Sequence, residues 1–328
     1  MAITIIISMQ NIIEYLLFIV GLISSYVIGA NNNATSLGIL FATNAIKRRY
    51  AYILNMVSIL VGVVLGSLTM LHSVYGVVYG NSLYVAIGIF TSLSSSIITF
   101  YYLNKSGIPS SLSQTFYPSI AILTLMSHGF IELDWVKFWV IVSSWVISPI
   151  VAIGFSLLLY LTLNKVVSAE TRIIKQITIY KNLILFSSAF TSFIVGANAI
   201  GIIVSSALLS APAYLVIPLY GISAALGVLT SQRIAIRVGF RITKLGYLGA
   251  SSALIGSNVI NEIFTILGIP LSITQTIIGG IVGLSFRSFT SDVRKQVIQI
   301  FRSWATSPIF AIILSLAIFG VIKSILGL

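Results

Sequence analysis

One nine-residue phrase occurs twice in this chain, as Gly107-Ile-Pro-Ser-Ser-Leu-Ser-Gln-Thr115 and as Gly268-Ile-Pro-Leu-Ser-Ile-Thr-Gln-Thr276. A second phrase, Trp-x-x-Ser-Pro-Ile, follows each copy and begins at Trp145 and at Trp304. The copies of both phrases lie about 160 residues apart, which is close to half of the chain, and self-similarity at a fixed spacing indicates a duplication. The chain therefore contains two repeats, each with one complete set of phrases.

The composition places these repeats in a lipid bilayer. Hydrophobic residues make up 58% of the chain, charged residues 7%, and the mean hydropathy is +1.09, far outside the range of soluble domains. Apolar segments long enough to span a membrane recur along the whole sequence. We expect an all-α, multi-pass protein of the cell membrane whose main partner is the lipid bilayer and which does not bind nucleic acid.

The net charge of +12 is explained by short basic clusters between the apolar segments. They lie at 47–49, 165–181, 233–244 and 287–302, and the positive-inside rule places them on the cytoplasmic side. Counting crossings between the clusters makes each segment of the second half run opposite to its partner in the first. This predicts a first repeat at 1–163, a cytoplasmic linker at 164–181 and a second, inverted repeat at 182–328. The same topology places Lys137 and Lys323 outside.

Polar interruptions of the apolar segments are expected near the middle of the membrane. They are Gly29-Ala-Asn-Asn-Asn-Ala-Thr35, its counterpart Gly196-Ala-Asn-Ala-Ile-Gly201, and the two Gly-Ile-Pro phrases. Irregular backbone inside a membrane is tolerated only where protein or a water-filled cavity satisfies it. We expect an inverted-repeat helical bundle with interrupted helices or re-entrant hairpins at the midplane. The sequence does not decide whether the segments around Pro109 and Pro270 cross fully or re-enter.

The interruptions predict an anion site. Proline opens a helix whose first turn carries hydroxyl groups and free N–H groups, and the positive end of the helix dipole attracts anions. Two such ends in one cavity would suit a tetrahedral oxyanion. The predicted substrate-binding residues are Asn31, Asn32, Ser111, Ser113, Gln114, Asn198, Ser272, Thr274 and Gln275.

The remaining residues argue against some classes of function and leave others open. The chain has no cysteine and two histidines, so no metal site and no cofactor are expected. No nucleophile with a base and no working carboxylate pair is evident, so an enzyme is not expected. An anion channel or a sensor could use the same helix ends, and the sequence leaves a homo-oligomer open.

The phrases resemble those of the PiT family of inorganic phosphate transporters. That family carries Gly-Ala-Asn-Asp-Val-Ala-Asn, Gly-x-Pro-Val-Ser-Thr-Thr-His and Trp-x-x-Ser-Pro in each half, and its Val-Gly-x-x-Ile-Thr-Lys-Leu loop resembles Val238-Gly-Phe-Arg-Ile-Thr-Lys-Leu245. The resemblance covers nearly the whole chain. It implies an inverted-repeat membrane bundle and cation-coupled uptake of phosphate, and some members of the family carry sulfate instead.

Departures from the family pattern bear on the choice of anion. Asn32 replaces the first Asp, Gln114 and Gln275 replace the two histidines, and the second Asp is replaced by Ala199 or, in the better alignment, by Val195. Phosphate near neutral pH can donate a proton to a carboxylate, whereas sulfate only accepts and would be repelled. The missing Asp residues favour a proton-coupled sulfate permease, and the family favours phosphate symport. Phosphate is the first expectation and sulfate the alternative.

The coupling cation, H⁺ or Na⁺, is also open. Glu262 is the one acid well inside an apolar segment, four residues after Asn258 and on the same helical face. A carboxylate there is costly unless it is paired, hydrated or protonated. Glu262, Thr35 and Asn258 are the candidate residues for the coupling ion.

Overall fold

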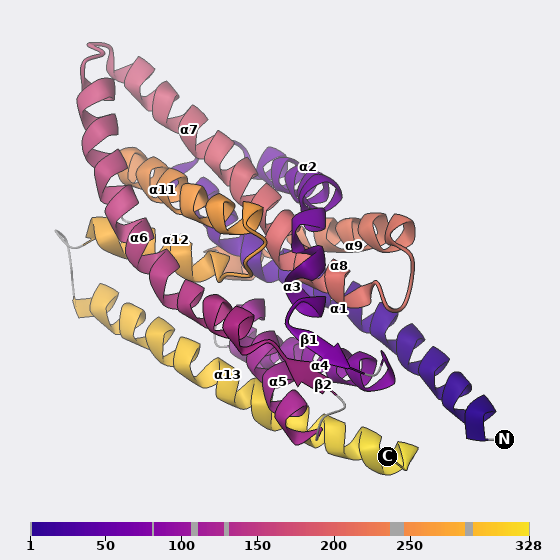
Figure 1. Ribbon diagram of the computed structural model, residues 1–328. Helices are drawn as coiled ribbons and strands as arrows, with labels where there is room; N and C mark the ends of the chain where they lie inside the picture. The colour runs from indigo at the N-terminus through magenta and orange to yellow at the C-terminus, as the bar shows by residue number, and fades with distance from the viewer. Residues whose placement is uncertain are drawn as a thin grey trace.

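The computed structural model describes residues 2–80, 82–105, 111–127, 131–236, 246–285 and 291–327, and nearly all of them are helical (Figure 1). Residues 107–110 of the first Gly-Ile-Pro phrase and the whole 238–245 loop lie outside the described residues. In chain order the elements are α1 (Ala2–Thr43), α2 (Arg48–Gly66), the 3₁₀ turn η1 (Ser67–Met70), α3 (Leu71–Tyr75), β1 (Val78–Gly80), α4 (Ser82–Lys105), α5 (Leu112–Met126), β2 (Ile131–Leu133), α6 (Trp135–Ser168), α7 (Ile173–Ile194), the π-helical η2 (Val195–Ile200), α8 (Gly201–Ala207), α9 (Ala213–Val228), α11 (Gly246–Ile266), α12 (Ile273–Ser285) and α13 (Ser291–Leu326).

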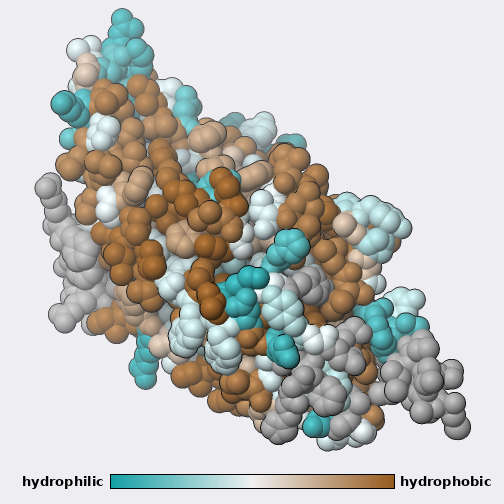
Figure 2. Space-filling view, in the orientation of Figure 1, coloured by the Kyte–Doolittle hydropathy of each residue, from teal (hydrophilic) through white to brown (hydrophobic). Residues whose placement is uncertain are grey.

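Helix length and composition confirm a multi-pass membrane protein. Six stretches among the described residues are long and apolar enough to cross a bilayer: Gln10–Thr43, Arg48–Val74, Leu83–Leu103, Trp135–Ser168, Ile173–Ala207 and Trp304–Leu326. Hydrophobic atoms cover much of the visible surface, and hydrophilic atoms gather at the end that carries the connection between α6 and α7 (Figure 2). This outward-facing apolar surface is what a helical bundle needs in lipid, where the backbone is satisfied inside each helix.

The two chain ends lie at one end of the bundle, and the α6–α7 connection lies at the other (Figure 1). Which of these two ends faces the cytoplasm stays a prediction from the sequence. Most of the segment 164–181 is helical, however, because α6 continues to Ser168 and α7 begins at Ile173. The connection itself therefore occupies only the few residues between these two helices.

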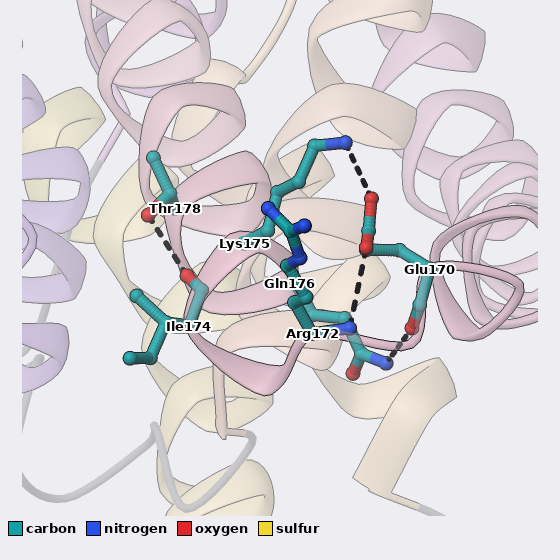
Figure 3. Close-up of polar contacts among 6 residues, drawn as sticks. All are labelled: Glu170, Arg172, Ile174, Lys175, Gln176 and Thr178. Carbon is teal, nitrogen blue, oxygen red and sulfur yellow. Dashed lines mark hydrogen bonds and ion pairs between the residues drawn. The ribbon is translucent and has the colours of Figure 1, made fainter.

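A polar clamp closes this connection (Figure 3). The Glu170 carboxylate pairs with the Lys175 ammonium at 2.5 Å and accepts a 3.2 Å bond from the Arg172 N–H. The Gln176 amide donates to the Glu170 carbonyl oxygen at 2.6 Å. Hydrogen bonding from Lys175 and then from Arg172 lowers the pKa of the Glu170 carboxyl. The clamp orders the start of α7 where it leaves the turn.

The two halves pack by exchanging partners. Helix α6 of the first half lies along α11 and α12 of the second, and α13 of the second half lies along α4 and α5 of the first. In the same way α1 packs on α9, and α7 packs on α2. The core therefore sits between the halves, as expected of repeats that fold as one unit. The inverted relation of the halves stays a prediction from sequence.

The asparagine triplet does not break its helix, so that expectation is wrong. Helix α1 runs without interruption from Ala2 to Thr43, because asparagine keeps its backbone N–H and can continue the helical hydrogen bonds. The second copy is different, since 195–200 forms a π-helical turn between α7 and α8. A side-chain carbon at Gly196 would lie 2.3 Å from the carbonyl oxygen of Ile59. Glycine there lets the π turn approach the backbone of α2.

In the sequence each Gly-Ile-Pro phrase falls between two helices that pack against each other: α4 packs against α5, and α11 packs against α12. Helix α5 has 15 residues and α12 has 13. At a rise of 1.5 Å per residue they reach about 20 Å, which is short of a hydrocarbon core of about 30 Å. The lengths of α5 and of the described part of α12 favour partial over full crossings by these two helices, although Leu83–Leu103 of α4 is long enough to span.

A small sheet not expected from the sequence joins two loops of the first half. Strand β1 pairs antiparallel with β2, with Val78 opposite Leu133 and Gly80 opposite Ile131. The N–H of Asp134 then donates to the carbonyl oxygen of Val77 at 2.7 Å, and the Asp134 side chain caps α6 by accepting from the Lys137 N–H at 3.0 Å. The sheet therefore fixes the start of α6 beside α3.

Candidate functional site

The two copies of the repeated phrase contact each other. The hydroxyl of Ser113, in the first turn of α5, donates to the carbonyl oxygen of Leu271 at 3.1 Å, although the two residues lie 158 positions apart. The hydroxyl oxygens of Ser111 and Ser113 are 3.1 Å apart. The start of α5 and the approach to α12 therefore meet at one place, with one contribution from each half.

The tip of the second hairpin is held by three different elements. The consecutive carbonyl oxygens of 269–271 each accept one side-chain hydrogen bond: from Asn198 of η2 at 3.2 Å, from Ser144 of α6 at 3.1 Å and from Ser113 of α5 at 3.1 Å. All three donors are neutral. The tip is thus fixed by single, exchangeable bonds rather than by charge pairs.

Asn198 has most of its hydrogen-bonding capacity engaged at this hairpin. Its amide nitrogen also donates to the Thr265 hydroxyl at 3.1 Å, and its amide oxygen lies 3.5 Å from the N–H of Leu271. In this state the residue positions the hairpin. Its predicted contact with an anion stays a prediction that requires some of these bonds to open.

The start of α12 carries two buried hydroxyl groups with no hydrogen-bond partner among the described residues. Ser272 is fully buried and Thr274 is 3% exposed. The first N–H groups of a helix have no partner within the helix, and the dipole there favours a negative ligand. Ser111, at the start of α5, likewise makes no capping bond with its side chain. The site offers donors from hydroxyls and helix ends.

The asparagines of α1 lie on a helix that contacts both η2 and α12. Asn31 and Asn32 are buried, and the amide of Asn31 donates to the amide oxygen of Asn32 at 3.3 Å. Asn33 is fully buried too, and neither of its polar side-chain atoms has a partner among the described residues. Asn33 was not among the predicted site residues, although its place as the third consecutive amide could have indicated it.

The two motif glutamines share a separate cavity of about 330 Å³. Gln114 and Gln275 line it together with Trp145 and Trp304 of the second repeated phrase, on the side covered by α6 and α13. The amide oxygens of both glutamines are buried, and neither has a hydrogen-bond partner in the part of the chain that the structure describes. The structure therefore brings these repeat partners together, next to the hairpin starts.

The coupling-ion candidates are divided between two helices. Thr35 is buried on α1. On α11, Asn258 is tied to α7, because its amide donates to the Ser187 carbonyl oxygen at 2.7 Å and accepts from the Thr191 hydroxyl at 2.9 Å. Glu262 is half-buried, and its Oε2 atom is buried with no partner among the residues that the structure describes. Asn261, which was not predicted from sequence, is fully buried, and neither of its amide atoms has a partner within the described ranges.

Charge is absent from the predicted anion-binding set, which consists only of Asn, Gln, Ser and Thr. An anion would be held here by neutral donors and helix ends, which is how many proteins bind oxyanions without a counter-charge. The fold and this site define a multi-pass membrane bundle with a polar, neutral centre between its halves.

Comparison with known proteins assigns this bundle to a family. The model of the phosphate transporter family matches residues 28–195 and 196–327, and the chain belongs to that family, whose members are transporters and not enzymes. It is 29% identical to a putative phosphate permease of Methanocaldococcus jannaschii (89% of this chain, 92% of that protein). It is 26% identical to the sulfate permease CysP of Bacillus subtilis (88% and 82%). A probable low-affinity inorganic phosphate transporter of B. subtilis is 27% identical (83% and 86%).

A solved structure has the same fold. It is described as the sodium-dependent phosphate transporter and superimposes with a TM-score of 0.86 at 19% identity, covering 95% of this chain and 99% of that one. The agreement extends over both halves, so the fold predicted from the repeated phrases is confirmed at the level of the whole bundle.

Proposed function

We propose that this protein is a secondary active transporter that moves a tetrahedral inorganic oxyanion across the cell membrane in symport with a cation, with phosphate as the first candidate. The observation that carries the proposal is the Ser113–Leu271 contact. It joins helix starts from both halves beside the unpartnered hydroxyls of Ser272 and Thr274. Two relatives named for phosphate, each aligned over more than four fifths of this chain, support the same anion.

Sulfate is the second candidate, and the residue at position 32 favours it. A carboxylate at that position could accept a proton from phosphate, whereas the Asn32 amide presents no charge to repel a dianion. The relative named as a sulfate permease aligns over 88% of this chain. Sulfate needs only donors, and the centre of this bundle is rich in hydroxyl and amide donors.

Coupling to a cation requires a group whose occupancy differs between states of the carrier. Glu262 can take up a proton directly, and its buried Oε2 atom has no partner among the described residues. Thr35 and Asn258 could supply neutral oxygen ligands to Na⁺. We propose H⁺ coupling through Glu262, with Na⁺ as the alternative.

Transport into liposomes tests both proposals. Purified protein is reconstituted, and uptake of labelled phosphate and labelled sulfate is followed under an imposed Na⁺ gradient or an imposed pH gradient. Saturable, gradient-driven uptake with counterflow supports a carrier. Conduction without exchange would make the protein a channel, and binding without net flux would make it a sensor.

A further inference from the structure

A second polar cavity, of about 340 Å³, lies between α3, the start of α6 and the tip of the second hairpin. We call it the outer vestibule; the lining residues that matter here are Thr69, His72, Ser73, Lys137, Gly268 and Pro270. It lies apart from the predicted anion site. The start of α6 is at the opposite end of that helix from the α6–α7 connection (Figure 1), so the vestibule faces outside on the predicted topology.

The vestibule carries donors for an anion. Lys137 is exposed, and its ammonium makes one ion pair among the described residues, a long 3.8 Å contact with Asp134. The Asp134 carboxylate also caps the backbone N–H of Lys137. An ammonium group has three N–H donors, and the long contact leaves them available. The imidazole of His72 is exposed at the same cavity.

A buried hydroxyl lies deeper in the same cavity. Ser73 is 5% exposed, and its Oγ atom has no hydrogen-bond partner among the described residues. Burying a hydroxyl without a partner is unfavourable, so this group is expected to bind a ligand or water. Its backbone is held in place, since the Tyr117 hydroxyl donates to the Ser73 carbonyl oxygen at 3.1 Å.

The hairpin tip separates the vestibule from the anion site. Gly268 has φ of +69°, and a side-chain carbon there would lie 2.9 Å from the Thr69 carbonyl oxygen, so the tip closes tightly on the vestibule wall. Asn198 and Ser113 hold the next residues of the tip by single hydrogen bonds. Release of these bonds would connect the vestibule with the centre of the bundle.

From this arrangement we propose that the outer vestibule is an external recruitment site for the transported inorganic oxyanion. Lys137 supplies the positive charge, Ser73 supplies a hydroxyl donor, and the hairpin tip is the barrier that the anion must pass. This inference rests on the proposed transport function. It adds a second site for the same class of ligand, reached before the central one.

Kinetics of uptake at different external anion concentrations tests the role of Lys137. We expect Lys137→Gln to raise the KM for external phosphate or sulfate about three- to tenfold at low ionic strength, because one unit charge near the anion is lost. The maximal rate should equal that of the parent, and the difference in KM between Lys137→Gln and the parent should shrink at high salt. Lys137→Arg should retain the parent KM, and Lys323→Gln, an exposed lysine on the same predicted face, should have no effect.

A single-cysteine reporter tests occupancy directly, because the chain has no cysteine of its own. His72→Cys should react with a membrane-impermeant thiol reagent from outside, and phosphate or sulfate at ten times its dissociation constant should slow labelling about tenfold. Lys323→Cys should label at the same rate with and without the anion. If uptake persists while Lys137→Gln keeps the parent KM and His72→Cys is unprotected, the vestibule proposal is wrong. If the parent protein shows no saturable oxyanion uptake, the transport proposal itself fails.

Discussion

The Asn198 side chain donates a hydrogen bond to the carbonyl oxygen of Ile269 at 3.2 Å, across 71 positions of sequence. A π-helical turn in one membrane helix thereby holds the tip of a hairpin formed by two others. π turns are frequent at functional sites because they displace side chains from the regular helical register. The amide at this turn is bonded to the hairpin tip, which lines the vestibule.

We predict that Asn198→Ala loosens the second hairpin. It removes the bonds to Thr265 and Ile269, and unfolding in detergent should require about 1–2 kcal/mol less free energy. Thr265→Val removes the other side of the Asn198–Thr265 hydrogen bond and completes a double-mutant cycle. The double variant should be less destabilised than the sum of the single variants, since both remove one shared bond. Strict additivity would show that the Asn198–Thr265 hydrogen bond contributes nothing to stability.

Thr274→Ala should weaken oxyanion binding without lowering stability. The Thr274 hydroxyl has no partner among the described residues, so its removal breaks no bond in the empty protein. A donor to a charged ligand is worth about 1.5–3 kcal/mol, and we expect affinity to fall about tenfold or more in a binding titration. Thr274→Ser should bind like the parent. Normal affinity in both Thr274→Ala and Ser111→Ala would move the anion elsewhere.

Asn32→Asp should change the choice between anions. The new carboxylate adds a negative charge, which penalises sulfate more than a phosphate species that can donate a proton to it. Competition between labelled phosphate and sulfate measures the ratio of transport rates. Asn32→Gln is the control. Asn55→Asp would not serve, because Asn55 is hydrogen-bonded within a buried network. An equal effect on both anions would contradict this role for position 32.

Glu262→Gln should abolish accumulation driven by a pH gradient and leave counterflow largely intact. The change keeps size and hydrogen-bonding capacity and removes only the titrating proton. Glu132→Gln, at an exposed carboxylate on β2, should leave pH-driven uptake as in the parent. Full pH-driven uptake by Glu262→Gln would make the residue structural and direct attention to Na⁺ at Thr35 and Asn258.

The clamp at the α6–α7 connection predicts a pH dependence of stability. Because its partners lower the pKa of folded Glu170, the clamp stabilises the fold above the ordinary carboxyl range, and this contribution is lost as pH falls through the lowered pKa. Melting temperatures of the parent and of Glu170→Gln should differ at neutral pH and converge in acid. A difference in melting temperature that persists in acid would mean that Glu170 does not stabilise the fold through its charge.

The membrane class and the meeting of the two phrases could be predicted from sequence because they depend on composition and repetition. Each Gly-Ile-Pro phrase precedes the start of a helix by a few residues, so Ser113 and Leu271 could be expected near each other once the halves were known to pack together. The continuous course of α1 through the asparagine triplet could not be predicted. Whether Asn32 bends a helix or lies within it depends on neighbours that the local sequence does not contain.

Other features depended on long-range contacts with no local pattern. Strands of three residues, such as β1 and β2, are too short to show alternation. Asn261 was missed because only the fold shows that its amide is buried without a partner among the described residues. The sharing of one cavity by Gln114 and Gln275 follows from the packing of α6 and α13, which no spacing in the sequence reveals.

The exchanged packing of α6 and α13 has a consequence for how the protein is made. The α4–α5 hairpin is covered by α13, which leaves the ribosome roughly half a chain later. Until then the faces of α4 and α5 that α13 covers can contact only lipid, although Ser95 and Ser119 already have hydrogen-bond partners within the pair. The first half therefore completes its packing only after α13 has been made, and a chain that ends before α13 should be less stable than the full chain.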